Sequence, residues 1–488
     1  MGRTRMRNSG YYPAMLYRPS QRFMVTAAVM AGMFLSAIDT TAVATAMPRI
    51  VESLGGMALY SWVFSIYMLA STATVPLFGY LSDLYGRKRL YLLGVTLFVG
   101  GSMLCSASTT MGQLIAFRGL QGLGAGALLP ITYAIIGDIY DLEERAKMQG
   151  LFSGVWGVSS VVGPLVGGVL ADLWSWRAIF FMNLPIGIVA AALVFIYLQE
   201  GVNQEEVGGI DILALASLTA GVAALLFGLQ QGGRTYAWAS PQIIGLLLLS
   251  VAGVAIFLLR DRKSDRPVLH PALMSDRIFQ VASGSGVFGG AALFGLAAYV
   301  PLYVQGVHAG SATLSGASLI PMTFGWVTAS VIAGRLLLRI GYRPTASWGL
   351  AAFIAGTLII AASAAWPSLT VLLAGMAVCG IGLGLSMTCF LIAVQNSAPA
   401  GLMGTATASV PFTRSIGGAV GVAAMGAVLL QSLGSEGLAL SASGSAGIAG
   451  PLSAAMLRVF LMAAAFATAA FAIGIWLPGG KAQDLARR

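Results

Sequence analysis

Fourteen long apolar segments run through the chain, separated by short polar or Gly- and Pro-containing breaks. A helix needs about 20 mostly apolar residues to span the hydrocarbon core of a membrane, and these segments are of about that length. The pattern therefore predicts an all-α, polytopic membrane protein. The expected spans are 23–47, 59–80, 90–107, 113–137, 148–171, 178–198, 210–229, 242–260, 280–304, 314–338, 346–365, 369–394, 404–430 and 455–477.

Lys and Arg gather in alternate breaks between these segments. If the N-terminus lies in the cytoplasm, most of the 27 basic residues fall on the cytoplasmic side, as the positive-inside rule requires. An even number of spans then places both termini in the cytoplasm, and we expect a multi-pass protein of the plasma (inner) membrane. The basic residues on this side are Arg3, Arg5, Arg7, Arg18, Arg22, Arg87, Lys88, Arg89, Arg145, Lys147, Arg260, Arg262, Lys263, Arg266, Arg277, Arg335, Arg339, Arg343, Lys481, Arg487 and Arg488.

Composition excludes several other classes. Of the 488 residues, 57% are hydrophobic and 9% charged, whereas a soluble chain has roughly 25% charged residues. A soluble globule and a disordered chain are therefore ruled out. The basic loops explain the net charge of +10, and no nucleic-acid recognition fold accompanies it. The 3 cysteines and 2 histidines lack metal or disulfide spacing, so we expect no metal and no cofactor. The first apolar run has no cleavage site and is interpreted as a spanning helix.

An internal repeat divides the chain. The segments Arg118 to Gly126 (RGLQGLGAG) and Met376 to Gly384 (MAVCGIGLG) share three glycines at an offset of 258 residues, and Gly79 matches Gly334 at an offset of 255. Duplicated helical halves are typical of transporters. The offset exceeds six spans, so two extra helices lie between the halves. The expected domains are a cytoplasmic basic tail (1–22), a six-helix bundle (23–200), two inserted helices (201–265), a second six-helix bundle (266–478) and a cytoplasmic tail (479–488).

Asp39 is an acid well inside the first predicted span, roughly 24 Å along it at 1.5 Å per residue. A carboxylate at such a depth is costly and usually functional or paired. Arg118 lies at a similar depth, and Gln121 neighbours it on the same helix face. We expect Asp39 to bind protons and Arg118 to pair with its charged form. The alternatives are a structural pair and an Arg118 that extends to the headgroups. Gln121 either bonds Asp39 or substrate, or holds helices together.

Arg414 lies about ten residues into the span 404–430, near mid-membrane, with no acid nearby in the sequence. An anionic substrate or a backbone carbonyl would be its partner, and the sequence does not decide between them. Six aromatic residues are candidates for lining a substrate cavity, although most aromatics in membrane helices pack or anchor. They are Trp62, Tyr67, Trp156, Tyr299, Tyr303 and Trp326.

Four motifs resemble those of the major facilitator superfamily, and in particular its fourteen-helix drug:proton antiporter branch of the EmrB/QacA type. They cover the first half densely, whereas the second half matches mainly in its helix pattern, with Leu338 at the position of Asp83. The motifs are Asp39 to Pro48 (DTTAVATAMP), Gly79 to Arg89 (GYLSDLYGRKR), Arg118 to Gly126 (RGLQGLGAG) and Gly157 to Gly168 (GVSSVVGPLVGG).

The resemblance implies two six-helix bundles, with two helices inserted between them, that rock about a central site. It implies that Asp83 latches the halves together on the cytoplasmic side, with Arg145 as the expected partner, and it favours Asp39 and Arg118 as the proton switch. The remaining latch residues are Gly79, Gly86, Arg87, Lys88 and Arg89. A conformational role is implied for Gly157, Gly163, Pro164, Gly167 and Gly168 of the last motif.

The leading interpretation is proton-coupled export of hydrophobic or amphiphilic small molecules by a monomer, with the proton gradient as driving force and no nucleic-acid partner. Export of lipids or glycolipids on the same fold is the alternative. A membrane enzyme is disfavoured because the spans carry no His cluster and no nucleophile–base set. No phosphate-binding Walker loop is present, which disfavours ATP-driven pumping. The glycine pattern at 157–168 counts against a sugar importer.

Overall fold

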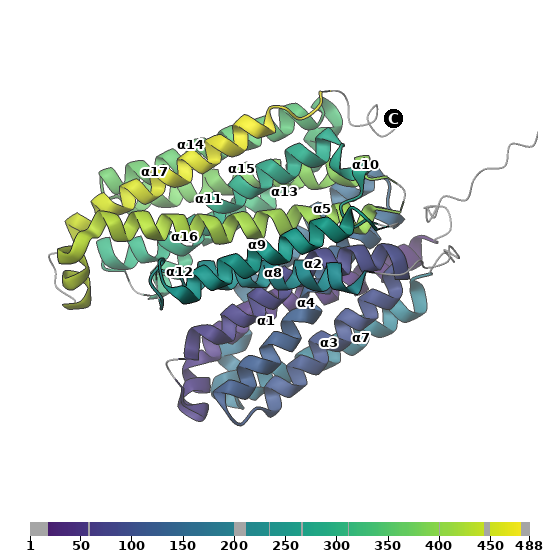
Figure 1. Ribbon diagram of the computed structural model, residues 1–488, viewed down its shortest axis with the longest axis horizontal. Coiled ribbons are helices and arrows are strands. Elements are labelled where there is room, and N and C mark those ends of the chain that lie inside the picture. The colour runs from purple at the N-terminus through teal and green to yellow at the C-terminus, as the bar shows by residue number, and fades with distance from the viewer. Residues whose placement is uncertain are drawn as a thin grey trace, which may run out of the picture.

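The computed structural model describes residues 18–56, 59–199, 211–233, 235–264, 267–310, 312–399, 401–443 and 449–479, and the long elements among them are all α-helices (Figure 1). Fourteen helical segments are long and apolar enough to cross a membrane. The predicted all-α class and number of spans are therefore confirmed. The basic residues Arg3, Arg5, Arg7, Arg266, Lys481, Arg487 and Arg488 lie outside the described residues.

The helices follow one another as two halves with a pair between them. The first half contains α1 (Pro19–Leu54), α2 (Tyr60–Tyr85), α3 (Arg87–Ala107), α4 (Met111–Ile139), α5 (Leu142–Leu173), α6 (Arg177–Phe181) and α7 (Asn183–Tyr197). The pair is α8 (Ile212–Gln231) and α9 (Pro241–Asp261). The second half contains α10 (Pro271–Met274), α11 (Arg277–Val307), α12 (Ala312–Ala317), α13 (Ile320–Ile340), α14 (Tyr342–Ala365), α15 (Leu369–Ser397), α16 (Met403–Ser443) and α17 (Ala449–Gly474).

Several predicted limits differ from those observed. Helix α1 begins at Pro19, within the expected tail, because proline has no N–H to satisfy and suits the first helical turn. The predicted spans 178–198 and 314–338 are each built from two helices, α6 with α7 and α12 with α13. The short helix α10, which also opens with a proline, was not predicted.

The expected basic loop after α2 is a single residue. Gly86 alone separates α2 from α3, and Arg87, Lys88 and Arg89 form the first turn of α3. Gly86 has φ +90°, and Gly341, 255 residues later, has φ +90° at the α13–α14 junction. Side chains with a Cβ rarely adopt this conformation, which explains why glycine recurs at both junctions.

The repeated glycines of the first half allow α4 to touch two neighbours. A Cβ on Gly122 would lie 2.6 Å from the carbonyl oxygen of Tyr67 in α2. A Cβ on Gly124 would lie 2.3 Å from the backbone nitrogen of Phe98 in α3. The backbones therefore approach as closely as small residues permit.

The second half repeats this packing in α15. A Cβ on Gly380 would lie 2.1 Å from the carbonyl oxygen of Met322 in α13, and one on Gly382 would lie 2.5 Å from the nitrogen of Phe353 in α14. Met322 and Phe353 follow Tyr67 and Phe98 by 255 residues each. The sequence repeat is thus a repeat of helix packing.

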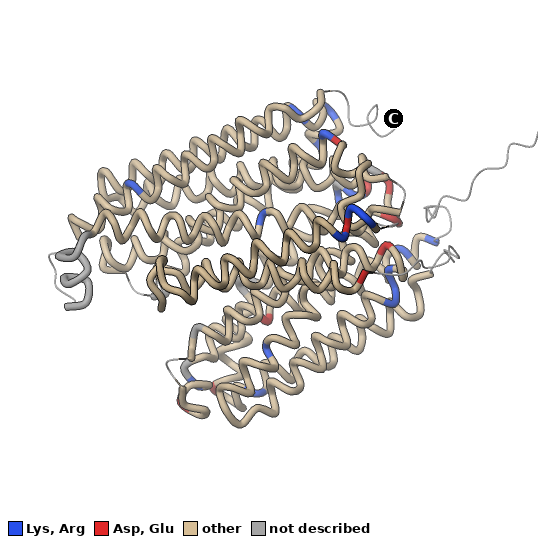
Figure 2. Tube along the Cα trace, in the orientation of Figure 1, with Lys and Arg blue, Asp and Glu red and all other residues tan. Residues whose placement is uncertain are grey.

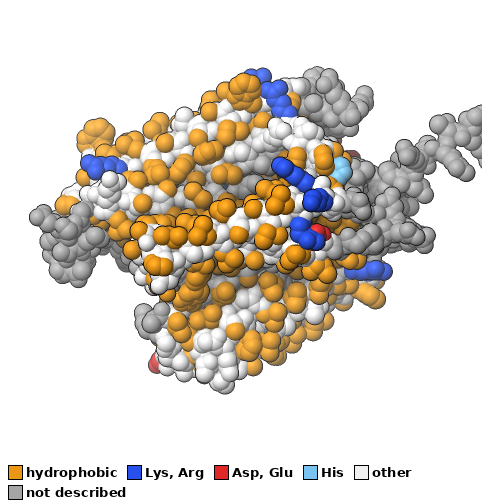
Figure 3. Space-filling view, viewed as in Figure 1, with side chains coloured by type: hydrophobic (Ala, Val, Ile, Leu, Met, Phe, Trp, Pro, Cys, Tyr) orange, Lys and Arg blue, Asp and Glu red, His pale blue; other side chains and the backbone are white. Residues whose placement is uncertain are grey.

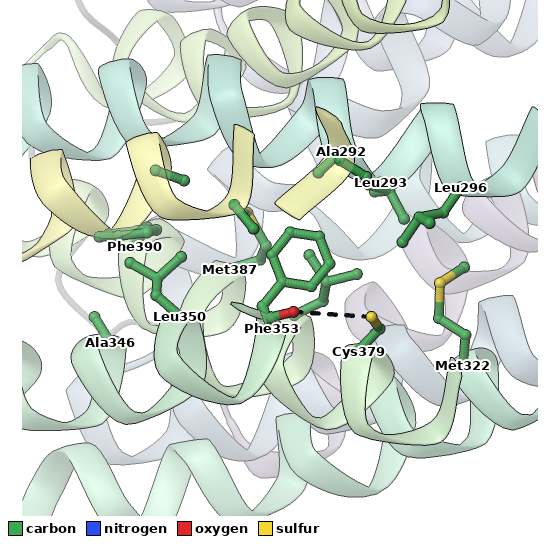
Figure 4. Close-up of a cluster of buried hydrophobic side chains, with 14 of the residues drawn as sticks. Ala292, Leu293, Leu296, Met322, Ala346, Leu350, Phe353, Cys379, Met387 and Phe390 are labelled. Carbon is green, nitrogen blue, oxygen red and sulfur yellow. Dashed lines mark hydrogen bonds between the residues drawn. The ribbon is translucent and has the colours of Figure 1, made fainter. Parts of the chain in front are cut away.

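The core of the second half is apolar and fully enclosed. Leu293 and Leu296 of α11, Leu350 and Phe353 of α14, and Phe390 of α15 belong to one buried cluster. Figure 4 shows these side chains converging, with the Cys379 thiol 3.9 Å from the carbonyl oxygen of Phe353. This bundle is held by close packing of apolar groups.

The two halves meet mainly along α2 with α16 and α5 with α13, and also where α4 packs on α16 and α5 on α15. The inserted helices α8 and α9 pack on each other, and α8 also packs on α2 and α16, so the pair lies along one side of the boundary (Figure 1). Asp211 and Arg260 join α8 to α9 at 2.7 Å. The hydrogen bond from Arg260 lowers the pKa of Asp211, which is consistent with an ion pair at the helix ends.

The lateral surface is apolar and the charges gather at the helix ends. Large aliphatic side chains are exposed along α7 and α9, for example Ile188, Ile196, Leu248 and Leu259. Figure 3 shows hydrophobic side chains along the visible helices, and Figure 2 shows most charged residues at one end of the bundle. The chain is therefore a multi-pass membrane protein, with its lipid-facing surface around the helices.

Candidate functional site: a buried ion pair and an inter-half latch

Asp39 and Arg118 form an ion pair inside the first half. Nη1 of Arg118 donates to Oδ2 of Asp39, and the two side chains are 1% and 0% exposed, respectively. The residues lie on α1 and α4, 79 positions apart in sequence. Their expected closeness is therefore confirmed. An Arg118 that extends to the headgroups is excluded by its full burial.

Two amides complete the shell of Asp39. Gln121 Nε2 donates to Asp39 Oδ1 at 2.9 Å, and its Oε1 accepts from Arg118 Nη1 at 2.8 Å. Asn183 Nδ2 donates to Asp39 Oδ1 at 3.2 Å and to Ser102 Oγ at 2.9 Å. The carboxylate thus accepts hydrogen bonds from three side chains, those of Arg118, Gln121 and Asn183.

The Arg118 guanidinium is enclosed by aromatic rings and backbone. Its Cζ lies 4.1 Å from the ring centroid of Tyr67 and 5.9 Å from that of Phe180, and its Nε donates to the carbonyl oxygen of Val63 at 3.3 Å. Tyr67 is buried, and its hydroxyl lies 3.0 Å from that of Ser36. Tyr67 therefore supports the ion pair, a role different from the expected cavity wall.

Asp83 joins the halves at the end of the molecule where α2 ends. Its carboxylate accepts from the backbone nitrogens of Gly404 at 2.8 Å and Thr405 at 2.7 Å, and from the Thr405 hydroxyl at 2.7 Å. These groups form the first turn of α16, where unpaired N–H groups favour an anion. Gly79 allows this approach, since a Cβ there would lie 2.5 Å from Ala408.

Arg87 fixes the position of Asp83. Its Nη1 lies 2.6 Å from Asp83 Oδ1 and 2.8 Å from Ser82 Oγ, and its Nε lies 3.0 Å from Asp138 Oδ2 at the end of α4. Lys88 points elsewhere, 5.0 Å over the ring of Phe195 in α7. Arg87 therefore reaches the Asp83 carboxylate, whereas Lys88 packs on α7.

The expected pairing of Arg145 with Asp83 is wrong. Arg145 Nη1 donates to Asn396 Oδ1 of α15 at 2.8 Å, and its Nε donates to the carbonyl oxygen of Tyr140 at 2.8 Å. Gln395 Nε2 adds a bond to the carbonyl oxygen of Tyr133 at 3.2 Å. Arg145 does join the two halves at the latch end, but through an amide, because Arg87 already occupies the Asp83 carboxylate.

The glycine motif of α5 packs on two helices. A Cβ on Gly163 would lie 1.9 Å from Thr41 Oγ1, and one on Gly167 would lie 2.4 Å from Thr45 Oγ1, both on α1. Gly157 faces Val327 of α13 in the other half. Nothing lies within 4 Å of a Cβ on Gly168, so close packing does not explain that glycine. Pro164 lies inside the helix between the two contacts with α1.

The remaining cavity candidates occupy different surroundings. Trp62 packs on Phe227 of α8, with 5.1 Å between ring centroids. Tyr303 is fully buried, and its hydroxyl donates to the carbonyl oxygen of Ser363 at 2.5 Å, so it is a core residue. Trp156 is 41% exposed on α5. Only Tyr299 lines the cavity described next.

A cavity of about 440 Å³ lies between α2, α8, α11 and α16, in the half of these helices distant from the latch. Its walls include Met68, Phe294, Tyr299 and Trp238, and none of the described residues that line it is Asp, Glu, Lys or Arg. Gln230 of α8 hydrogen-bonds Ser65 of α2 at its edge. The inserted pair thus closes one side of an apolar cavity at the boundary of the halves.

Arg414 lies in α16 between the halves. Its Cζ lies 5.8 Å from the ring centroid of Trp326 of α13, and its buried Nε has no hydrogen-bond partner among the described residues. Across the boundary, the phenol of Tyr133 in α4 interacts with it electrostatically. Trp326 and Arg414 therefore meet at the interface between the bundles.

Sequence reasoning missed Asn183, Asp138 and Asn396. Asn183 is a lone amide within the apolar run 178–198, a signal of the same kind that marked Asp39. Asn396 follows Asp138 by 258 residues, the offset of the glycine repeat, so the repeat itself pointed to both. In the part of the chain that the structure describes, no group of His, Cys, Asp and Glu has the geometry to hold a metal.

Comparisons with known proteins agree with this architecture. The family model of the Major Facilitator Superfamily matches residues 29–422. Multidrug transporter protein MdtP of Bacillus subtilis is 37% identical, with 84% of this chain and 76% of that protein covered. Multidrug resistance protein 3 of the same organism is also 37% identical, with 84% and 80% covered. The crystal structure of the human transporter MFSD10 superposes with a TM-score of 0.65 at 17% identity, covering 94% of this chain and 100% of that one, which shows a shared fold.

Proposed function

The chain belongs to the Major Facilitator Superfamily, and from this premise we propose that it exports hydrophobic or amphiphilic small molecules in exchange for protons. Members of this family are transporters, so the expectation that the chain is not an enzyme is confirmed. Two of the relatives above are named multidrug proteins, and a third, from Dothistroma septosporum, is named an efflux pump. These names support export of small molecules.

The buried pair of Asp39 and Arg118 is the observation that carries proton coupling. Uphill export must draw on a gradient, and a carboxylate inside the membrane is a group that can load and release a proton. Protonation removes the charge that holds Arg118, so the pair has two states. A ligand or proton that favours one state shifts the balance between conformations.

The bonds that Asp83 and Arg145 make between the halves support the conformational part of the proposal. Asp83 and Arg145 bond the second half at the end where basic residues gather, and the positive-inside rule assigns that end to the cytoplasm. We infer that both termini are cytoplasmic, that the membrane is the plasma (inner) membrane and that the chain acts as a monomer. In this arrangement the cytoplasmic side is closed. Rocking of the halves would break the latch and expose the site to the cytoplasm.

The test is transport by purified protein in liposomes with an imposed pH gradient, using a panel of fluorescent dyes. Wild type is expected to move dyes against their gradient and protons in the opposite direction. Asp39→Asn is expected to abolish pH-driven transport while substrate binding persists. Asp39→Glu is expected to keep part of the pH-driven transport. Asp172→Asn is the matched control, since Asp172 is an exposed carboxylate. Wild-type-like, proton-driven transport by Asp39→Asn would return Asp39 to a structural role.

The apolar cavity beside α8 supports a second candidate, export of lipids or glycolipids. A cavity at the boundary of the halves whose described lining residues carry no charge suits an acyl chain. Labelled phospholipids and glycolipids belong in the same assay. Proton-driven movement of labelled lipid, with no movement of dyes, would favour this candidate over drug export.

A further inference from the structure

Arg414 is placed deep in the bundle. Helix α16 begins at Met403 beside the latch, and Arg414 follows 11 residues later. At 1.5 Å per residue it lies roughly 16 Å along the helix. That distance is about half of a hydrocarbon core of ~30 Å. A charge at this depth needs a partner or water.

The guanidinium of Arg414 has no anionic partner among the described residues. The buried arginines Arg87 and Arg118 each bond a carboxylate, and the buried Arg145 bonds the Asn396 amide and a backbone carbonyl. Around Arg414 the groups are the ring of Trp326 and the phenol of Tyr133, and its Nε is left without a hydrogen bond. Arginine stays protonated in proteins, so the positive charge remains.

The packing of α11 on α16 fixes the position of Arg414. A Cβ on Gly290 would lie 2.0 Å from the carbonyl oxygen of Arg414, so the backbones of α11 and α16 are in direct contact. The side chain lies over the ring of Trp326 in α13 of its own half, and α16 packs on α4 of the other half. It therefore lies at the interface between repeats, where transporters of this architecture bind substrate.

The charge balance at this interface favours an anion. The buried carboxylate of Asp39 is already neutralised by Arg118 inside the first half. Arg414 presents a planar fork of N–H donors, which matches the two oxygens of a carboxylate or phosphate. The neighbouring indole of Trp326 offers an apolar face to the body of a ligand.

We propose that Arg414 binds the oxyanion of an amphiphilic substrate, with Trp326 against its apolar body. This assignment rests on the proposed export function and names its substrate class. It distinguishes the protein from an exporter of cations, since a cationic ligand at this place would meet an unpaired positive charge.

The test compares three probes with one aromatic body and different charge: 1-pyrenebutyrate, its neutral methyl ester and 1-pyrenebutylamine. Binding to purified protein in detergent, and pH-driven export from neutral phosphatidylcholine liposomes, are both measured. Wild type is expected to bind the carboxylate on the order of 10-fold to 100-fold more tightly than the ester, the range of a charge-assisted hydrogen bond.

Arg414→Gln is expected to remove the preference for the carboxylate while binding of the ester is kept, which also shows that the variant is folded. Arg414→Lys should keep part of the preference, because lysine supplies charge without the planar fork. Arg458→Gln is the matched control, since Arg458 is an exposed arginine that bonds Ser432. Its preference should equal that of wild type.

Equal affinities for the three probes in wild type, a preference for the amine, or an unchanged carboxylate preference in Arg414→Gln would overturn the proposal. Proton-driven export of the ester without any charge preference leaves the export function standing and removes this inference. Carboxylate preference in binding without proton-driven export supports this inference and removes the export function. Displacement of pyrenebutyrate by phosphatidylglycerol identifies a lipid phosphate as the source of the oxyanion, and its failure to compete identifies a free carboxylate.

Discussion

Asp138 and Asn396 occupy equivalent positions in the two halves, 258 residues apart, but only Asp138 carries a charge. Asp138 pairs with Arg87 within the first half at 3.0 Å. Asn396 donates to the Tyr342 hydroxyl at 2.5 Å and accepts from Arg145 of the opposite half at 2.8 Å. The two equivalent positions thus differ: Asp138 forms an ion pair within one half, whereas Asn396 forms a bridge between the halves in which only Arg145 is charged.

Adding a charge should tighten this bridge. Asn396→Asp places a carboxylate against Arg145 and converts a bond with one charged partner into an ion pair, a gain of about 1 kcal/mol. We expect the latch-closed population to rise by roughly five-fold and turnover to fall. Distances between spin labels on the two halves would report the population. Asn396→Ala should lower the latch-closed population. A latch-closed population that is unchanged in both variants would contradict a role for the bond between Arg145 and Asn396.

Asp83→Asn should open the latch. The variant loses the ion pair with Arg87 and weakens the bonds to the first turn of α16, at a cost of about 2 kcal/mol. Cross-linking between α2 and α16 should show fewer latch-closed molecules, and turnover should be slower. Thr405→Val is a graded control that removes only the hydroxyl bond, so its effect should be smaller. A larger effect in Thr405→Val than in Asp83→Asn would contradict this order.

Arg118→Ala should destabilise the first half at neutral pH. It leaves the Asp39 carboxylate buried without its cation, and breaking a buried pair in this way costs about 3–5 kcal/mol. Thermal unfolding in detergent at neutral pH measures the loss. Arg118→Lys, which keeps the charge, should lose less thermal stability than Arg118→Ala. Equal melting temperatures for wild type and Arg118→Ala would exclude a stabilising ion pair.

Two glycines of the α5 motif should respond differently to the same substitution. A Cβ on Gly163 would lie 1.9 Å from Thr41 Oγ1, whereas one on Gly168 meets nothing within 4 Å. Gly163→Ala should push α5 from α1 and lower transport and thermal stability, by about 1–3 kcal/mol as for overpacked cores. Gly168→Ala should leave both unchanged. Equal effects would show that the motif does not act through contact with α1.

A reporter fused at Leu269 should read as cytoplasmic. Leu269 follows α9, and its backbone nitrogen donates to Asp261 at the end of that helix at 3.0 Å. Two inserted spans return the chain to the side from which α8 started. Labelling of a cysteine at this position by an impermeant reagent gives an independent reading, and an extracellular result would require a different topology.

The sequence predicted the fold well because its signals are local. Each span needs a run of about 20 apolar residues, and that length is visible without knowledge of any neighbour. The repeat offset separated the halves and showed that a pair was inserted. The limits at Pro19 and at the α6–α7 and α12–α13 breaks were missed, because an apolar run looks the same whether its helix is continuous or broken.

The site was predicted in part. Asp39 and Arg118 stood out because a charge inside an apolar run is costly wherever it lies in the fold. Their similar depth along antiparallel helices allowed a pair, and the family resemblance favoured it over an Arg118 that extends to the headgroups. Tyr67 and Tyr303 carried no such signal, because an aromatic side chain packs equally well against a cation, a core or a cavity.

The sequence by itself determined the number of spans, the two halves and the buried charges, since these follow from the hydropathy of residues close together in the chain. Only the tertiary structure decided which groups each charge meets. Asp83 bonds Thr405 across 322 positions, and Arg145 bonds Asn396 across 251. Such pairs depend on how the two bundles approach each other. No local pattern encodes that approach, because the partner of Asp83 is largely the backbone of a helix end, which every helix possesses.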